Sequence, residues 1–399
     1  MMKILKRLFL LCLCVALLGG SALANEAADY SVEGYDDLYY KTTMPDGRLV
    51  FTGSIGEPGN YMDSRARILC LNPDMTVSWE YIDPAEGCCR FGDAAFLKDG
   101  TLGVLFEDSP FQTTEEIKLK FFTAEGRLTG KEIPLDSSSE YSVLPSGLLT
   151  EYWIGKKSES YVELTDWEGK VRFRWQGYGP MAWENLIEEE DGLVLIGREA
   201  GILENAAGMI MKVDWQGNTV WETVVPFLKE ENEGAGLNGC RTSDGCYLAV
   251  LGERGLNDGP VDSEWTMALV KFSPQGRILW ISTESLETIS SDYLFSEAVE
   301  YNGKYVIQCE HKNRFGSLSY PIRYLWFDTD GKALGTTEMN IRKEDFARLA
   351  DKRKVEAILG KLIPAGNGLW QVFACWDESN NHEKEMTSTD EVFLKVPEL

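Results

Sequence analysis

Short apolar runs separated by glycine-bearing turns repeat along most of the chain. Residues 268–284 (ALVKFSPQGRILWISTE) contain one apolar run, a turn with Gly276, and a second apolar run with Trp280. Residues 209–225 (MIMKVDWQGNTVWETVV) repeat this pattern. Val, Ile, Trp and Phe fill the runs, and these side chains favour strands because they pack well on a pleated surface. Each copy is therefore predicted to be a β-hairpin.

Two series of turns alternate along the chain, and we name them the first turn and the second turn of each unit. First turns are mostly Asp-Gly or Asn-Gly pairs followed by a β-rich run, and their glycines are Gly47, Gly100, Gly147, Gly192, Gly245, Gly303 and Gly368. Second turns are those of the hairpins above, with glycines at Gly126, Gly169, Gly217, Gly276 and Gly331 and with Met75 in the same place of the first copy. Successive first-turn glycines are 53, 47, 45, 53, 58 and 65 residues apart.

Each unit holds about four strands, one before the first turn, one after it, and the two arms of the second-turn hairpin. Four strands in a repeat of about 40–50 residues are typical of β-propeller blades, including WD40-like ones. The sequence thus predicts an all-β fold, a seven-bladed β-propeller of four-stranded blades. Residues 25–399 are expected to form this single domain.

The final unit lacks a second turn, so its blade is one strand short. The segment at residues 28–34 (ADYSVEG) is expected to supply the missing strand by pairing with residues 391–397. Within these segments, residues 30–32 are predicted to pair with residues 392–396. Closure of this kind removes exposed sheet edges.

Two kinds of segment depart from the repeat. Residues 343–361 (KEDFARLADKRKVEAILGK) have apolar residues at helical spacing, so we expect a short helical insertion there. Residues 107–116, 252–264 and 377–389 are long and polar. Long loops on a rigid scaffold are where binding usually resides.

The first 24 residues have the features of a cleaved secretory signal. Lys3, Lys6 and Arg7 precede an apolar stretch at residues 8–18, and Ala22 and Ala24 provide small residues at a cleavage site before Asn25. A membrane span needs about 20 apolar residues, so an anchor is the weaker interpretation. The mature protein is therefore expected to be secreted, extracellular or in the cell envelope.

Acidic residues outnumber basic ones by 64 to 39, which gives a net charge of −25. Cleavage would remove three basic residues and no acidic ones, so the mature charge becomes −28. Such a surface repels phosphate backbones and anionic lipid. We expect no nucleic-acid partner, no membrane span and a monomer.

Seven cysteines remain after cleavage, and this odd number leaves at least one outside any intramolecular disulfide. Cys240 and Cys246 flank a turn, where a hairpin disulfide is one alternative, although the loop length places them diagonally. The chain has only two histidines, His311 and His382, and no pair of C-x2-C motifs, so a structural zinc site is not expected. For the same reason a histidine-based catalytic triad has little support.

Several further motifs allow a functional and a structural interpretation. Aromatic residues four places after the turn glycine are interpreted as packing between blades rather than as a binding surface; they are Trp79, Phe173, Trp221 and Trp280, with Gly130 and Gly335 in the same place of two other copies. The Asp328-Thr329-Asp330-Gly331 motif is interpreted as a β-turn rather than a calcium loop, because the further acidic ligands are absent. The acidic run at residues 188–191 is interpreted as a solvated edge. Paired carboxylates for glycoside hydrolysis come from distant strands, so the sequence selects none.

The turn glycine followed by tryptophan, as in WQGNTVW and PQGRILW, resembles the PQQ-like (quinoprotein-type) β-propeller repeat over residues 38–399. Quinoprotein alcohol dehydrogenases of this superfamily carry adjacent disulfide-bonded cysteines beside the quinone, and the resemblance would place Cys88 and Cys89 there. Those enzymes have eight blades, whereas this chain has seven units and no matching calcium ligand set. The other interpretation is that one of the pair bonds Cys70 or that both are simply buried. We therefore expect no cofactor, no metal site and no catalytic set.

Three hypotheses of function follow. The favoured one is a secreted binding or scaffold module for a protein or glycan partner. The alternative is a secreted propeller enzyme, a hydrolase or a quinoprotein oxidoreductase, with its site in the central funnel. A structural component of an envelope assembly is the third. Carboxylates that converge with a cationic side chain near the axis would favour the enzyme.

Overall fold

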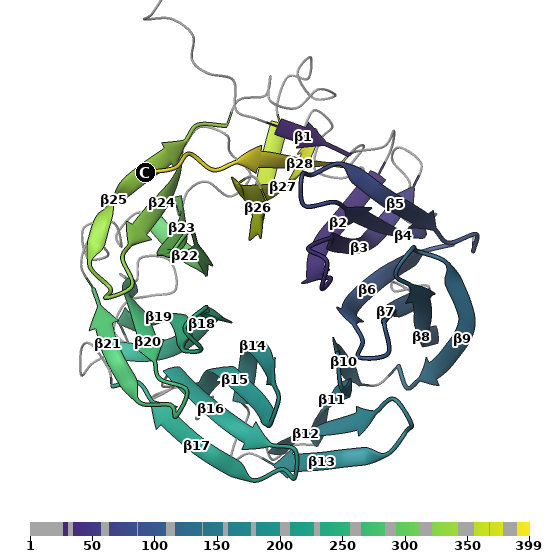
Figure 1. The fold of residues 1–399 in the computed structure, drawn as a ribbon, viewed down its shortest axis with the longest axis horizontal. Helices are drawn as coiled ribbons and strands as arrows, with labels where there is room; N and C mark the ends of the chain where they lie inside the picture. The colour runs from purple at the N-terminus through teal and green to yellow at the C-terminus, as the bar shows by residue number, and fades with distance from the viewer. Residues whose placement is uncertain are drawn as a thin grey trace, which may run out of the picture.

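The computed structural model describes residues 27–30, 35–56, 64–85, 87–108, 116–137, 139–154, 159–176, 181–199, 208–226, 232–255, 265–283, 293–311, 321–341, 355–366, 368–377 and 389–399. Within these ranges the chain forms 28 strands, and no helix suited to crossing a membrane is found among them. The strands build seven four-stranded antiparallel sheets, arranged as blades around a central axis (Figure 1). This confirms the predicted seven-bladed β-propeller.

The blades follow the chain in order, and each begins with its innermost strand. Blade 1 consists of β2 (Tyr35–Thr43), β3 (Leu49–Gly56), β4 (Ser64–Leu71) and β5 (Val77–Ile82). Blade 2 consists of β6 (Cys89–Phe96), β7 (Thr101–Asp108), β8 (Glu116–Thr123) and β9 (Leu128–Leu135). Blade 3 consists of β10 (Glu140–Leu144), β11 (Gly147–Ile154), β12 (Glu159–Asp166) and β13 (Val171–Gln176). Blade 4 consists of β14 (Met181–Glu189), β15 (Gly192–Glu199), β16 (Gly208–Asp214) and β17 (Thr219–Val224).

The remaining blades complete the ring. Blade 5 consists of β18 (Asn232–Arg241), β19 (Tyr247–Gly255), β20 (Trp265–Phe272) and β21 (Ile278–Ser282). Blade 6 consists of β22 (Tyr293–Tyr301), β23 (Lys304–His311), β24 (Ile322–Phe327) and β25 (Ala333–Met339). Blade 7 consists of β26 (Val355–Ala365), β27 (Gly368–Asp377), β28 (Thr389–Lys395) and β1 (Ala27–Asp29).

The apolar core is divided into seven clusters, one at each junction between neighbouring blades. Each blade is covered on both faces by its neighbours, so its middle strands are apolar without alternation, as in β3, which is buried along nearly its whole length. The outermost strand faces solvent, as β9 does. This explains why the repeat has continuous apolar runs followed by a more polar arm.

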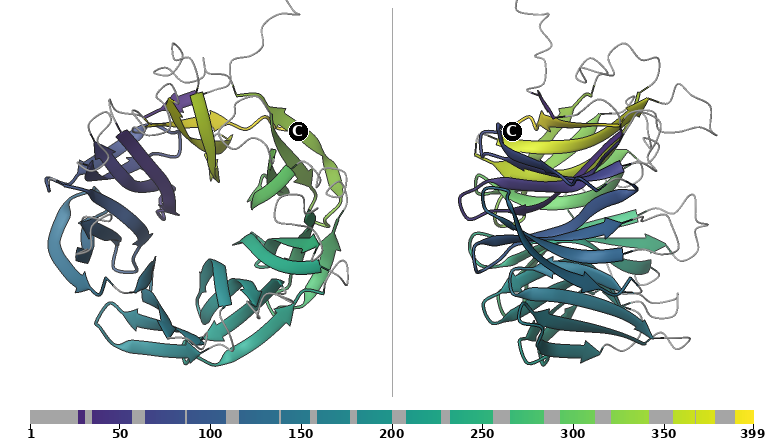
Figure 2. Two further views of the ribbon diagram at one scale, coloured as in Figure 1. Left: turned by 180° about the vertical axis from the view of Figure 1, so that it is seen from behind. Right: turned by 90° about the vertical axis from the view of Figure 1, so that its right-hand side faces the viewer.

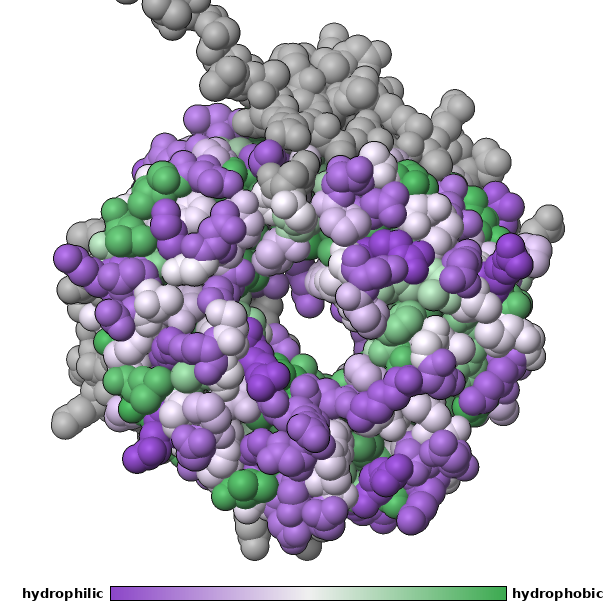
Figure 3. Space-filling view, viewed as in Figure 1, coloured by the Kyte–Doolittle hydropathy of each residue, from purple (hydrophilic) through white to green (hydrophobic). Residues whose placement is uncertain are grey.

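First and second turns lie on one face of the ring, which we call the turn face. Connections between the second and third strands, and between blades, lie on the opposite face, as the side view in Figure 2 shows. The polar loops predicted at residues 107–116, 252–264 and 377–389 join second to third strands, and most of their residues lie outside the described ranges. Figure 3 views the turn face, where a central opening is surrounded largely by hydrophilic residues.

The aromatic residue four places after the turn glycine packs between blades, as expected. The indole of Trp79 lies against Gly126 of the next blade, and its Nε1 donates a hydrogen bond to the Ala124 carbonyl oxygen at 3.0 Å. Trp221 and Trp280 lie in the same way against the glycines of the following second turns. These rings therefore belong to the scaffold.

The N-terminal strand closes the ring. β1 pairs with β28 so that Ala27 lies opposite Leu394 and Asp29 lies opposite Val392. This pairing begins three residues earlier than the expected residues 30–32, and residues 31–34 lie outside the described ranges. Tyr30 instead packs its ring edge-on against Phe393 at 5.2 Å.

The prediction of a helical insertion at residues 343–361 is wrong for the second part of that segment. Val355–Ala365 is strand β26, which pairs with β27, and a bulge between Leu359 and Leu362 shifts its register. The bulge adds a residue to the strand, so apolar positions lose the two-residue alternation of a regular strand. Residues 342–354 lie outside the described ranges.

The cysteine alternatives are settled for the described thiols. Cys70, Cys240, Cys246 and Cys309 are free, so neither the Cys240–Cys246 hairpin disulfide nor a bond to Cys70 forms. Cys240 pairs across the sheet with Leu248, which places it diagonally from Cys246.

Candidate functional site

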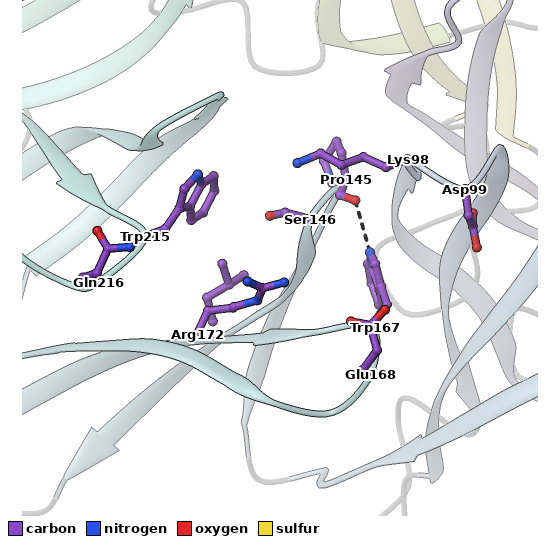
Figure 4. Close-up of a pocket in the computed structure, with 10 residues that line it drawn as sticks. Lys98, Asp99, Pro145, Ser146, Trp167, Glu168, Arg172, Trp215 and Gln216 are labelled. Carbon is purple, nitrogen blue, oxygen red and sulfur yellow. Dashed lines mark hydrogen bonds between the residues drawn. The ribbon is translucent and has the colours of Figure 1, made fainter.

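A cavity of about 490 Å³ lies on the turn face where blades 2, 3 and 4 meet (Figure 4). Four turns provide most of its wall: Lys98 and Asp99 after β6, Pro145 and Ser146 after β10, Trp167 and Glu168 after β12, and Trp215 and Gln216 after β16, with Leu164 and Arg172 from β12 and β13. This volume is within the range of small-molecule sites. We call it the turn-face pocket.

Two indole rings from neighbouring blades line the turn-face pocket, and both are held in place by backbone hydrogen bonds. Trp167 Nε1 donates to the Pro145 carbonyl oxygen at 3.2 Å, which Figure 4 marks. Trp215 Nε1 donates to the Glu190 carbonyl oxygen at 2.8 Å, and its ring lies 6.4 Å from that of Phe173. Because both ring N–H groups are already bonded, the rings offer fixed apolar surfaces to a ligand.

The fold does not require tryptophan at these two places. Trp167 and Trp215 occupy the second position before the glycine of the second turn. The other four copies carry smaller residues there: Pro73, Ala124, Pro274 and Thr329. All six turns form, so the two indoles are additions to the repeat. Sequence reasoning missed them, although the Asp-Trp pair shared by two neighbouring copies was the available signal.

Positive charges at the turn-face pocket are already paired with carboxylates. Arg172 Nε donates to Asp166 Oδ2 at 2.7 Å, and Lys98 Nζ lies 3.2 Å from Glu188 Oε1. Hydrogen bonds from the Lys170 backbone N–H and from Arg172 lower the pKa of the Asp166 carboxyl. The lining therefore has polar groups without a surplus of positive charge, and it does not favour an anionic ligand.

Ser146 gives the turn-face pocket a further hydrogen-bonding group. Its backbone N–H donates to Glu188 Oε2 at 3.0 Å, which fixes the turn. Its buried Oγ has no hydrogen-bond partner among the described residues, and buried hydroxyls normally have one. In Figure 4 this side chain lies between Trp215 and Trp167.

The acidic run at residues 188–191 is a solvated edge only in part, since Glu190 and Asp191 are exposed whereas Glu188 and Glu189 are partly buried. Glu188 bonds the Ser146 turn, Glu189 Oε1 lies 3.0 Å from Arg241 Nε of blade 5, and Asp191 pairs with Lys212 at 2.6 Å. The run sits at a first turn, where Glu188 and Glu189 reach the adjoining blades while Asp191 pairs within blade 4. Glu188 and Glu189 therefore link blades, and Glu188 supports one wall of the turn-face pocket.

The other motifs lie outside the turn-face pocket. Asp328 forms the predicted β-turn, since its Oδ1 accepts hydrogen bonds from the backbone N–H groups of Asp330 and Lys332 at 3.0 and 2.9 Å. His311 ends β23, and His382 lies outside the described ranges. Among the described residues no group of three or more His, Cys, Asp or Glu side chains is placed to hold a metal ion.

Cys88 and Cys89, which the resemblance would place beside a quinone, are 2% and 0% exposed. Cys89 begins β6 and belongs to the apolar cluster between blades 1 and 2. Its Sγ lies 3.4 Å from Asp108 Oδ1. The pair thus offers no exposed surface for a quinone to stack on, and these residues do not fit that cofactor.

The central channel is not apolar. Charged residues of the innermost strands interact electrostatically with one another, among them Lys41 of β2, Asp93 of β6 and Lys361 of β26. Glu297 of β22 is 9% exposed and accepts a hydrogen bond from the Leu362 backbone N–H at 2.6 Å. Burial raises the pKa of Glu297 to about 7.

No protein-family model and no curated protein matches the sequence. Among solved structures, the chain is similar to the β-propeller domain of the Trilobed protease from Pyrococcus furiosus, with a TM-score of 0.48, 10% identity, and coverage of 88% of this chain and 97% of that one. It is also similar to the periplasmic gluconolactonase of Pseudomonas aeruginosa, with a TM-score of 0.48, 12% identity, and coverage of 76% and 85%. A prolyl endopeptidase matches with a TM-score of 0.48 and 10% identity over 91% of this chain and 50% of the other. Similarity at this level carries no information on activity.

Proposed function

We propose that the chain is a secreted β-propeller binding module whose turn-face pocket takes a neutral glycan. The single observation that carries this proposal is the pair of fixed indoles, Trp167 and Trp215, at a position where the other repeats have small residues. Sugar rings present C–H faces that suit aromatic surfaces, and hydroxyl groups that suit polar side chains such as Gln216 and Glu168.

The charge of the turn-face pocket supports a neutral ligand over an acidic one. Arg172 and Lys98 are paired with Asp166 and Glu188, and a carboxylate ligand would have to compete with these partners. A cavity of about 490 Å³ suits one or two sugar rings better than a protein surface, which needs a larger and flatter contact. The features of a secretory signal in residues 1–24 support export, where glycans are available.

The test is isothermal titration of residues 25–399 with a panel of neutral and acidic oligosaccharides, followed by tryptophan fluorescence. The expected result is saturable binding of a neutral oligosaccharide that changes the emission of the wild type. Binding of acidic glycans alone would contradict the charge argument. If no glycan binds and a protein partner is captured instead, the ligand of the turn-face pocket is a protein rather than a glycan.

The alternative function, an enzyme with its site in the central funnel, is favoured by one observation. Carboxyls and amines with pKa values shifted toward neutrality gather in the channel: burial raises the pKa of Asp93 and Glu297, and burial lowers that of Lys41. Such groups occur at catalytic sites and also in structural networks. Hydrolase activity that is lost in Asp93→Asn and retained in Trp215→Ala would establish this alternative.

A further inference from the structure

Arg172 brings hydrogen-bond donors to the turn-face pocket that the fold itself does not use. Its Nε donates to Asp166 Oδ2 at 2.7 Å, which holds the guanidinium group in place. The N–H groups of Nη1 and Nη2 have no hydrogen-bond partner among the described residues, and the side chain is 53% exposed. In the view of Figure 4, Arg172 lies between the indoles of Trp167 and Trp215. A ligand held by these rings can therefore reach the free donors.

Arg174 follows Arg172 on β13 and provides a comparison. Its Nε and Nη2 both donate to Glu163 Oε2, the former at 2.9 Å, and the residue does not line the turn-face pocket. Arg172 bonds its own carboxylate partner through Nε alone. The strand thus accommodates an arginine whose Nη2 is bonded to a neighbouring carboxylate. The free Nη groups of Arg172 are therefore a feature of the pocket and not of the strand.

The charge of Arg172 is balanced by a carboxylate that is fixed behind it. The Asp166 side chain is 5% exposed, and its Oδ1 also accepts hydrogen bonds from the backbone N–H groups of Lys170 at 2.8 Å and Glu168 at 3.2 Å. A guanidinium paired in this way keeps its directional N–H donors but offers little net positive charge. It therefore suits an uncharged oxygen acceptor better than a carboxylate ligand.

The most suitable acceptor for Arg172 is a carbonyl oxygen. Guanidinium N–H groups can only donate, so the ligand group that faces them must accept. A carbonyl oxygen only accepts, whereas a sugar hydroxyl also brings a proton that needs an acceptor of its own. A neutral glycan presents a carbonyl oxygen where an amino sugar is N-acetylated, because this modification replaces a hydroxyl group by an acetamido group.

Other residues of the lining match the rest of an acetamido group. Trp167 and Leu164 offer apolar surface to its methyl group. The Glu168 carboxylate has no side-chain partner among the described residues, so it can accept the amide N–H. The turn-face pocket thus combines a donor for the carbonyl oxygen, an acceptor for the N–H and an apolar surface for the methyl group.

On the basis of the glycan function proposed above, we propose that the turn-face pocket selects an N-acetylated amino sugar and that Arg172 determines this specificity. The acetamido oxygen accepts hydrogen bonds from the Nη groups of Arg172, the methyl group packs against Trp167 and Leu164, and the amide N–H donates to Glu168. The hydrogen bonds from Arg172 are charge-assisted, yet the ligand remains neutral.

Isothermal titration of residues 25–399 with a matched pair of disaccharides tests this specificity. N,N′-diacetylchitobiose and cellobiose share the β-1,4 linkage and differ in the group on carbon 2 of each ring, which is acetamido in the first and hydroxyl in the second. Diacetylchitobiose is expected to bind about ten-fold more tightly or better, because cellobiose lacks the carbonyl oxygen that faces Arg172. The N-deacetylated disaccharide is expected to bind no better than cellobiose.

Arg172→Met is expected to lower the affinity for diacetylchitobiose to that for cellobiose. Thermal unfolding shows whether this variant folds, and the exposed position of Arg172 predicts an unfolding temperature near that of the wild type. Arg174→Met is the matched control, because it removes a guanidinium of the same strand outside the pocket, and it should keep the preference. Trp215→Ala should weaken binding of both disaccharides, so it reports on the glycan function itself.

The specificity proposal and the glycan proposal can fail separately. The specificity proposal is overturned if a neutral glycan without acetamido groups binds as tightly as diacetylchitobiose, if the deacetylated disaccharide binds best, or if folded Arg172→Met keeps the wild-type preference. Binding of any neutral glycan in these cases leaves the glycan function intact. If no neutral glycan binds, both proposals are wrong.

Discussion

Gly276 lies directly on the indole of Trp221 from the preceding blade. A Cβ atom at Gly276 would come within 2.4 Å of the ring, and the backbone there has φ of +75°. Thr223 adds a hydrogen bond from its Oγ1 to the Gly276 carbonyl oxygen at 2.6 Å. The glycine of one repeat and the tryptophan of the repeat before it thus form one contact, which explains why both recur at fixed places.

Gly276→Ala is expected to lower the free energy of unfolding by about 2–5 kcal/mol, since a clash with the ring adds to the strain of a positive φ. Gly245→Ala is the matched control. Gly245 has φ of +80°, but a Cβ atom added there would meet none of the described residues beyond its chain neighbours within 4 Å, so only the strain of about 1–2 kcal/mol applies. Denaturant unfolding measures both, and equal losses would show that Trp221 does not restrain the turn.

The sequence predicted the blades because their determinants are local and repeated. Each second-turn glycine and each ring four places later are set by a hairpin of a few residues, and six copies of this hairpin make the period visible. Met75 was correctly aligned with the turn glycines, and its backbone has φ of +67°. Strand order within the blades follows directly from such hairpins.

The candidate sites were not predicted, because they depend on contacts between repeats. Trp167 and Trp215 stand in two similar turns of the sequence, and only the ring brings them to one cavity. Bulges interrupt six of the seven innermost strands, and they shift side chains by one position without leaving a signal in composition. The same effect made the start of β26 look helical.

Trp215 and Trp221 lie six residues apart and are expected to respond differently to replacement by alanine. Trp215→Ala should weaken glycan binding at least ten-fold, since buried tryptophan anchors contribute about 2 kcal/mol or more to binding. The same variant should lose only about 1 kcal/mol of folding stability. Trp221→Ala should destabilise the protein by about 3 kcal/mol or more because a blade junction loses its ring. Titration and unfolding of both variants measure this, and a large loss of stability in Trp215→Ala would assign it to the scaffold.

Closure of the ring depends on a strand of only three residues. A chain that begins at Tyr30 lacks β1 and exposes the edge of β28, so it should be less stable than a chain that begins at Ala27, by about 2–3 kcal/mol. Tyr30 still packs against Phe393 in both. Unfolding in denaturant compares the two chains directly. Equal stability would mean that the pairing of β1 adds nothing to closure.

Glu297 should make stability depend on pH in a specific window. Its folded pKa of about 7 lies above its ordinary value of 4.5, because burial outweighs the opposing effects of the Leu362 N–H bond and of Lys361. The native carboxyl therefore keeps a proton that the unfolded chain has already released. The stability that this proton confers is complete below pH 4.5 and is lost as the pH rises to about 7, to a total of about 3 kcal/mol.

Glu297→Gln mimics the protonated carboxyl and keeps an oxygen that accepts the Leu362 N–H. The variant should match the wild type near pH 4.5 and exceed it in stability by up to about 3 kcal/mol at pH 8. Glu222→Gln, at an exposed position of β17, is the control and should show no such divergence. A constant difference between wild type and Glu297→Gln from pH 4.5 to 8 would show that Glu297 is ionised throughout that range in the folded protein.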